Sequence, residues 1–252
     1  MSERLRLDNV RDALVRLEET IISRLIERAQ FCQNPMVYEA DALGAPLQGL
    51  SILGFLLRET ESTHAKLRRY TSPDEHSFFQ DLPEPVLPSL TYCDNPLESN
   101  SININAQVRW IYEQEIIPAI CRPGDDRQYG SSAVNDVSCL QAISKRVHYG
   151  KFVAESKFRG DEATYRECIL NGDSRHLMAL ITDPDIENSV LRRVRHKAQT
   201  YCSEISSSSS ELLSPDTIVS IYSRWIIPMN KDVQVKYLMQ RVSADRPAED
   251  PE

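Results

Sequence analysis

The sequence predicts an all-α protein, built as a single-domain bundle of long amphipathic helices. Apolar residues recur every three or four positions through most of the chain, which is the spacing of one face of an α-helix. No segment shows the apolar and polar alternation of a half-buried strand. With 252 residues, the chain is long enough to bury a sizeable core. We find no internal repeat in it.

Composition limits the classes of partner. A formal net charge of -8 argues against nucleic acid as the main partner, so local cations must attract any anionic ligand. The six cysteines show neither CxxC pairs nor metal-type spacing, which indicates reduced thiols and no metal site. No stretch approaches eighteen uninterrupted apolar residues, and the N-terminal segment has no apolar region of a signal peptide. We therefore expect a cytoplasmic protein that does not bind a membrane.

Two long amphipathic helices are expected first, over residues 7–31 and 48–70. Apolar residues form one continuous stripe along the first of them. Residues 33–47 contain two prolines and a glycine, and predict a loop. After the second helix, residues 72–75 (Ser-Pro-Asp-Glu) combine an N-cap, an N1 proline and a glutamate at N3. This combination predicts that a short helix starts there.

The middle of the chain is less regular. Residues 78–97 contain four prolines and predict an irregular, partly extended segment. Helical spacing returns over residues 102–120, where Pro118 is expected to bend the end of the helix. Residues 124–132 predict a polar loop, and the helix that follows carries residues 144–158.

Three more helices complete the prediction, over residues 161–171, 183–202 and 214–242. The second opens on Asp183-Pro184, an N-cap followed by an N1 proline, and the third should kink near Pro228. The serines at 206–210 predict a mobile loop, and the polar residues 243–252 a disordered tail. The helical domain is thus expected to span residues 1–242.

One helical face between residues 144 and 158 allows two interpretations. Arg146, Gly150, Val153 and Lys157 share this face, and the two cations lie roughly 16 Å apart along the axis. Glycine inside a helix costs about 1 kcal/mol relative to alanine, so it needs a reason. The face could form a slot for a small anionic molecule. Alternatively, Gly150 could let another helix pack closely beside two solvated cations, which spacing alone favours.

Five segments, spread in order over nearly the whole chain, resemble eukaryotic, chiefly fungal, all-helical chorismate mutase. These are residues 10–22 (VRDALVRLEETII), 67–75 (LRRYTSPDE), 144–158 (SKRVHYGKFVAESKF), 180–188 (LITDPDIEN) and 226–238 (IIPMNKDVQVKYL). The resemblance implies a homodimer of helical subunits that converts chorismate to prephenate, a step in phenylalanine and tyrosine biosynthesis. It implies neither a metal nor a cofactor.

The resemblance also implies a catalytic set. Arg11, Arg146 and Lys157 match the cations that hold the carboxylates and ether oxygen of the substrate. Glu187 matches the carboxylate that binds the ring hydroxyl. Gln234 stands where the best-known member of the family has glutamate, and a neutral amide there can still donate a hydrogen bond to the ether oxygen.

Two further substrate-binding positions depart from the family pattern. Asp183 falls where the best-known member has asparagine, and Asn230 where it has threonine. Asn230 and Gln234 are four residues apart on one helix, so both can point into a common site. The two substitutions change the expected hydrogen-bond partners but leave the site itself in place.

The chemistry of the reaction agrees with such a set. An intramolecular pericyclic rearrangement needs no nucleophile, metal or cofactor. It needs a flexible dianion held in a reactive shape, and stabilisation of negative charge on the ether oxygen. Taken alone, each of three residues has a simpler interpretation. Arg11 would be a surface charge, Glu187 a charge that favours a helix N-terminus, and Gln234 an exposed amide. Their joint occurrence within five ordered segments favours the catalytic interpretation.

A regulatory site is implied as well. Arg68, Arg69, Gly130 and Ser131 match positions that bind an aromatic amino acid at the dimer interface of the family, with tyrosine and tryptophan as possible effectors. Val134 stands where the best-known member has threonine. Because valine donates no hydrogen bond, we expect weakened or altered feedback, above all by tyrosine.

The alternative to an enzyme is a non-catalytic helical regulatory or interaction protein that has kept the fold. The retained cations and Glu187 argue against it, since a scaffold has no need for charges around a slot.

Overall fold

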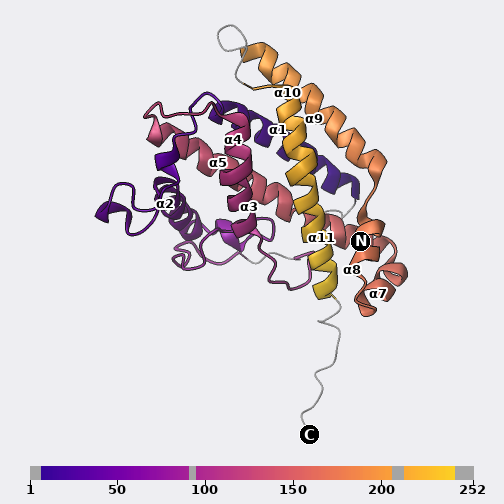
Figure 1. The fold of residues 1–252 in the computed structure, drawn as a ribbon. Helices are drawn as coiled ribbons and strands as arrows, with labels where there is room; N and C mark the ends of the chain where they lie inside the picture. Colours follow the sequence, from indigo (N-terminus) through magenta and orange to yellow (C-terminus); the bar gives the residue numbers. More distant parts are fainter. Residues whose placement is uncertain (1–6, 91–94, 206–212, 242–252) are drawn as a thin grey trace.

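The computed structural model describes residues 7–90, 95–205 and 213–241. The helices within these ranges lie in residues 7–71, 105–205 and 215–241 (Figure 1). They contain eleven α-helices and no β-strand, which confirms the predicted all-α fold. The predictions for residues 206–210 and 243–252 lie outside the described residues.

Two long helices, α1 (Leu7–Arg28) and α5 (Tyr129–His148), pack against each other at the centre of the molecule (Figure 1). The predicted apolar stripe explains this contact, because its members Ile21, Leu25 and Ile26 are buried. Helices α2 (Ile52–Lys66) and α3 (Asn105–Ile111) also pack on α5. The buried side chains form one core cluster with members from α1 to the last helix.

The helix predicted to carry residues 144–158 is divided. Helix α5 ends at His148, and α6 (Gly150–Gly160) begins after Tyr149. At this junction the Phe152 amide donates to the Tyr149 carbonyl at 3.1 Å, a spacing of three residues that tightens the turn. Arg146 and Lys157 therefore lie on two consecutive helices.

Two short helices and one long helix follow. Helices α7 (Glu162–Leu170) and α9 (Pro184–Ile205) match the prediction to within a few residues. Between them lies α8 (Ser174–Ile181), which we did not predict. Asp173 caps it by accepting a hydrogen bond from the His176 amide at 2.9 Å. An aspartate before an apolar segment is a signal that could have identified this helix.

The last predicted helix does not simply kink at Pro228. Helix α10 (Pro215–Ile221) passes through a π-helical turn, η6 (Tyr222–Ile226), into α11 (Ile227–Arg241). The Ile227 amide donates to the Tyr222 carbonyl, five residues back. A wider turn fits here because proline supplies no amide hydrogen and crowds the preceding turn.

The same arrangement occurs earlier in the chain. Helix α3 continues through the π-helical turn η5 (Tyr112–Ile116) into α4 (Ile117–Ile120), with Pro118 in the place of Pro228. Both turns have the sequence Tyr-X-X-X-Ile-Ile-Pro. This short repeat corrects our finding that the sequence has none.

Three other predictions about local structure are wrong. The second helix is shorter than residues 48–70, because Ser51 caps it by accepting from the Gly54 amide. No helix starts at residue 72, since Glu75 pairs with Lys145 at 2.6 Å and with Arg69 at 3.1 Å. Residues 129–132 belong to α5 and not to a polar loop. The predicted loop over 33–47 contains two 3₁₀ turns, η2 (Pro35–Val37) and η3 (Ala45–Leu47).

Candidate active site

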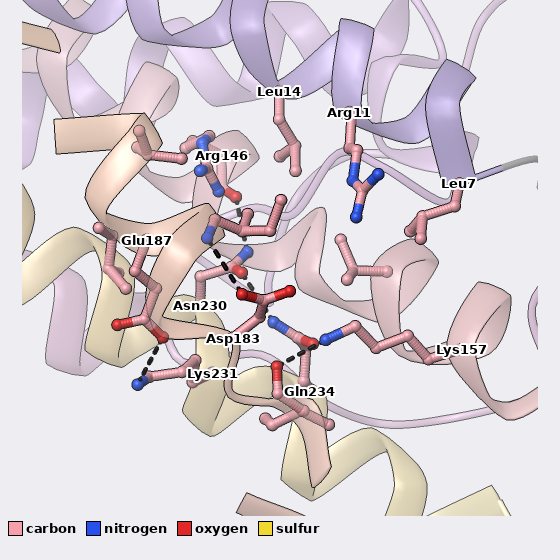
Figure 2. A pocket seen from close by; sticks show the side chains of 15 residues that line it. Leu7, Arg11, Leu14, Arg146, Lys157, Asp183, Glu187, Asn230, Lys231 and Gln234 are labelled. Carbon is pink, nitrogen blue, oxygen red and sulfur yellow. Dashed lines mark hydrogen bonds and ion pairs between the residues drawn. The ribbon is translucent and has the colours of Figure 1, made fainter. Parts of the chain in front are cut away.

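A pocket opens between α1, α5, α6, α9 and α11 (Figure 2), and the empty space in it and in the solvent at its mouth is about 730 Å³. Its walls bring together side chains from nearly the whole length of the chain, and apolar residues such as Leu14, Val153 and Val190 separate the polar ones. All the residues predicted to be catalytic or substrate-binding line it. They are Arg11, Arg146, Lys157, Asp183, Glu187, Asn230 and Gln234.

Two arginines approach the pocket from α1 and α5 (Figure 2). Arg11 is half exposed and lies 3.7 Å from Asp8, a loose ion pair. Arg146 is only 4% exposed, and its Nε and Nη1 atoms have no hydrogen-bond partner within the described residues. Burial lowers the pKa of Arg146 from its ordinary value. A buried guanidinium with free N–H groups is a ready binding group for a carboxylate.

Lys157 enters from α6, across the pocket from the arginines (Figure 2). Its ammonium group donates to the Ile181 carbonyl at 2.5 Å. Burial lowers the pKa of Lys157, although the nearby Asp183 carboxylate acts in the opposite direction. Two of its three N–H groups remain for a ligand, by the donor count of an ammonium group.

The two carboxylates at the start of α9 have different partners. Asp183 accepts hydrogen bonds from the Asp185 and Ile186 amides, both at 3.1 Å, and so acts as the predicted N-cap. Glu187 forms an ion pair with Lys231 at 2.9 Å. Sequence reasoning missed Lys231, although its place directly after Asn230 put it beside a predicted site residue.

Asn230 and Gln234 lie on α11 and are both buried. The Asn230 amide nitrogen donates to the carbonyls of Arg146, at 3.1 Å, and Val147, at 3.0 Å. The Gln234 amide nitrogen donates to the Asn230 oxygen at 3.0 Å. The Gln234 oxygen is buried without a partner among the described residues.

The structure decides between the two interpretations of Gly150. A Cβ atom at this position would lie 2.6 Å from the Asn230 carbonyl oxygen. Gly150 is therefore required for close packing of α6 on α11, and it does not open the slot. Val153, on the same predicted face, does line the pocket.

A recess continues the pocket past Arg146 toward Glu18 and Arg193. The Glu18 carboxylate is fully buried and accepts two hydrogen bonds from Arg193, at 2.7 and 2.8 Å. Sequence reasoning missed this pair. Glu18 falls within the apolar stripe of α1, three residues before Ile21, and that spacing could have identified a buried charge.

The five predicted effector-binding residues do not line one pocket as the seven predicted catalytic and substrate-binding residues do. Arg68 donates to the Pro88 carbonyl, and Arg69 contacts Glu75 and Gln141. Gly130, Ser131 and Val134 are exposed in the first turns of α5. Gln141 lies seven residues beyond Val134, about 10 Å along the helix. The hydrogen bonds described for Arg68 and Arg69 do not reach Gly130, Ser131 or Val134.

The charges of the pocket suit an anion. Of the described residues that line it, four are cationic (Arg11, Arg146, Lys157 and Lys231) and two are carboxylates (Asp183 and Glu187). The formal balance of +2 matches a ligand with two negative charges. No group of three or more His, Cys, Asp or Glu side chains among the described residues could hold a metal ion.

The fold and the pocket together define an all-helical protein with a binding site for a small dianion. The family model of chorismate mutase type II matches residues 129–235. A chorismate mutase of Schizosaccharomyces pombe is 41% identical over 248 residues, which cover 96% of this chain and 98% of that relative. The chloroplastic chorismate mutase 1 of Petunia hybrida is 41% identical over 251 residues, which cover 96% of this chain and 77% of that relative.

Solved structures of chorismate mutases also resemble this chain in fold. The chorismate mutase of Candida albicans in complex with L-Trp has a TM-score of 0.91 at 38% identity, covering 97% of this chain and 94% of that one. AtCM1 with tyrosine bound in its allosteric site has a TM-score of 0.88 at 41% identity, covering 96% and 98%. This chain belongs to the chorismate mutase family, which confirms the resemblance seen in the sequence.

Within the described residues, no helix is both long enough and apolar enough to cross a membrane.

Proposed function

We propose that this protein is a chorismate mutase, an isomerase that rearranges chorismate to prephenate. The observation that carries the proposal is the buried guanidinium of Arg146, whose free N–H groups line a pocket with a formal charge balance of +2. Membership of the family supports the same conclusion.

The proposed roles follow from the positions of the charges. Arg11 and Arg146 bind the two carboxylates of the substrate and hold it in a compact shape, which brings the reacting carbon atoms together. Lys157 stabilises negative charge on the ether oxygen as the C–O bond breaks, and the second amide hydrogen of Gln234 adds to it. Glu187, which forms an ion pair with Lys231, accepts a hydrogen bond from the ring hydroxyl.

The proposal extends to assembly and regulation. We propose a cytoplasmic homodimer in which Arg68 and Arg69 of one subunit face Gly130, Ser131 and Val134 of the other, so that an aromatic amino acid binds between them. Relatives bind such effectors: AtCM1 has been solved with tyrosine, and the Candida albicans enzyme with tryptophan. The separation of the two groups within one chain is what a site shared between subunits requires.

The test is the loss of chorismate, followed by its ultraviolet absorbance, with prephenate confirmed by chromatography. The full-length protein should turn over chorismate, and a Lys157→Met variant should be nearly inactive while it keeps its helicity. A folded wild-type protein without activity would contradict the proposal. The same assay with tyrosine or tryptophan tests the regulatory part.

A further inference from the structure

We propose that Asn230 is a positioning residue for the rearrangement, which holds Arg146 and Gln234 in place and donates no hydrogen bond to the substrate. This inference rests on the proposed function, and it replaces the substrate-binding role predicted for Asn230 from the sequence.

Every donor of the Asn230 side chain is used within the protein. An amide group has two N–H donors, and those of Asn230 go to the carbonyls of Arg146 and Val147. Both carbonyls lie in the last turn of α5, where helix carbonyls lose their intrahelical partners. The carboxylates and the ether oxygen of the proposed substrate can only accept hydrogen bonds, so Asn230 has nothing left to offer them.

The same contacts fix the orientation of two amide groups. Because backbone carbonyls only accept, the nitrogen of Asn230 must face α5 and its oxygen must face Gln234. Gln234 must then turn its own nitrogen toward Asn230, at 3.0 Å. One hydrogen of that nitrogen binds Asn230, and the other remains for the ether oxygen. A glutamine without this neighbour could present its oxygen there and repel the developing charge.

Close packing makes the arrangement rigid. The Asn230 backbone meets Gly150 at a distance that leaves no room for a Cβ atom. Asn230 therefore ties α11 to the junction of α5 and α6, which carry Arg146 and Lys157. Threonine, the residue of the best-known family member, has one hydroxyl donor and cannot bind both carbonyls.

The experiment measures kcat and KM for Asn230→Ala, alone and combined with Gln234→Ala, in the full-length protein. We expect kcat to fall between about ten- and a hundredfold, as small displacements of reacting groups do, with KM changed much less. When Gln234 is already alanine, Asn230→Ala should lower kcat by a factor at least threefold smaller than in the wild type. The reason is that Asn230 then has no Gln234 amide left to orient.

A matched control separates this role from simple stabilisation. Asn105 is also buried, donates to two backbone carbonyls (those of His76 and Ser77) and accepts from Ser144, but it does not line the pocket. Asn105→Ala should lower the melting temperature as much as Asn230→Ala and leave kcat nearly unchanged. If Asn230→Ala does not fold, Asn230→Thr replaces it, and its loss of kcat should likewise shrink in the Gln234→Ala background.

The outcomes are distinct. An inactive wild type contradicts the proposed function. An active wild type in which Asn230→Ala raises KM tenfold at constant kcat, or in which the Asn230 and Gln234 effects multiply independently, overturns the positioning role alone.

Discussion

Two buried arginines, Arg28 and Arg146, differ in whether their guanidinium groups have hydrogen-bond partners within the protein. Arg28 is fully buried, and its guanidinium donates to Asp136 at 2.6 Å and to several backbone carbonyls. Arg146 is almost as buried, yet two of its nitrogens have no partner among the described residues. An unpaired buried charge is unfavourable for the fold. Arg28 is therefore paired within the fold, whereas Arg146 keeps N–H groups free for the ligand proposed above.

This contrast predicts opposite effects of one substitution. Arg146→Met should lower kcat/KM by about a thousandfold or more and leave the free energy of unfolding unchanged or increased. Arg28→Met should leave Asp136 buried without its partner and lower that free energy by about 3–5 kcal/mol. Urea unfolding and the chorismate assay measure both. Equal destabilisation by the two variants would show that Arg146 also supports the fold.

A second prediction concerns Gln234 and pH. An amide does not titrate, so the wild type should keep its kcat/KM across neutral pH. A glutamate there has a reference pKa of about 4.3, and donates only when it is protonated. Burial would raise that pKa, and Lys157 would lower it. Activity of Gln234→Glu should fall as pH rises, because its carboxylate then repels the charge on the ether oxygen. Identical pH–rate profiles for the two proteins would remove Gln234 from the reacting bond.

The candidate site was predictable because its residues occur together in ordered segments that resemble one family, although Arg11, Glu187 and Gln234 look ordinary when taken alone. All seven predicted pocket residues line one pocket. Lys231 was missed because it looks like an ordinary surface charge in the sequence, and Glu18 because its place in the apolar stripe of α1 names no partner. Only the fold brings Lys231 to Glu187 and Glu18 to Arg193. The roles of these residues still await the experiments above.

At the scale of helices, the α5–α6 junction is where the sequence pattern was least informative. Gly150 fits both an open slot and a close contact, and only the position of α11 distinguishes them. The π-helical turns were invisible to helical periodicity, since one additional residue in a turn leaves the apolar pattern on either side intact. Long amphipathic helices such as α1 and α9 were predictable because their apolar stripes are continuous.

Gly150 and Gly160, the two ends of α6, offer a matched pair. Gly150→Ala should destabilise the protein by about 1–3 kcal/mol, because its Cβ atom would collide with the Asn230 backbone oxygen. Gly160→Ala meets nothing within 4 Å and should be neutral, or stabilising by up to about 1 kcal/mol. Thermal unfolding of both variants measures the difference. A stable Gly150→Ala would mean that α11 can move away from the junction.

A buried cluster of basic groups lies behind the same junction. The ring of His148 stacks on His76 with centroids 4.1 Å apart, and Lys151 donates to His76 at 2.7 Å. His148 accepts from the Ile104 amide at 3.0 Å, so that nitrogen must be unprotonated. Burial lowers the pKa of His148 to about 4 and that of His76 to about 2. The charge of Lys151 adds to both shifts, and that of His148 adds to the shift of His76.

These shifts predict a loss of stability in mild acid. The unfolded chain binds a proton at His148 near pH 6.5, and the folded protein only near pH 4. The free energy of unfolding therefore has its full value above pH 6.5 with respect to His148. It decreases as pH falls toward 4, by on the order of 3 kcal/mol for this residue. His148→Gln should show a smaller loss over this range in urea unfolding. An equally steep loss in the variant would assign the effect to other groups.

At the scale of the whole molecule, the proposed regulatory site combines residues from two separate parts of the chain. Val134 is 56% exposed and offers a methyl group where a hydroxyl could meet an effector. Arg69 is held by Glu75 and Gln141, close to the end of α2. The described contacts of Arg69 use its Nε and Nη1 atoms.

We predict that activity responds to tryptophan and that Arg69→Ala abolishes the response. Val134→Thr should strengthen inhibition by tyrosine, because it restores a hydroxyl partner. Dose–response curves for both amino acids, measured beside the molecular mass in solution, check this. If Val134→Thr leaves the tyrosine response unchanged, another residue makes that contact. A monomeric protein that still responds would place the effector elsewhere.

The π-helical turns affect how a change in chain length would act on this molecule. Each turn accommodates one residue more than an α-helix of the same rise, while the helices on both sides keep their faces. A deletion of one residue between Tyr222 and Ile226 would convert the turn to an α-helix and leave α11 facing the pocket. The same deletion one turn later would rotate Gln234 by about 100° and remove it from the site. Insertions and deletions among relatives should therefore be found at these turns and not in the helices beside them.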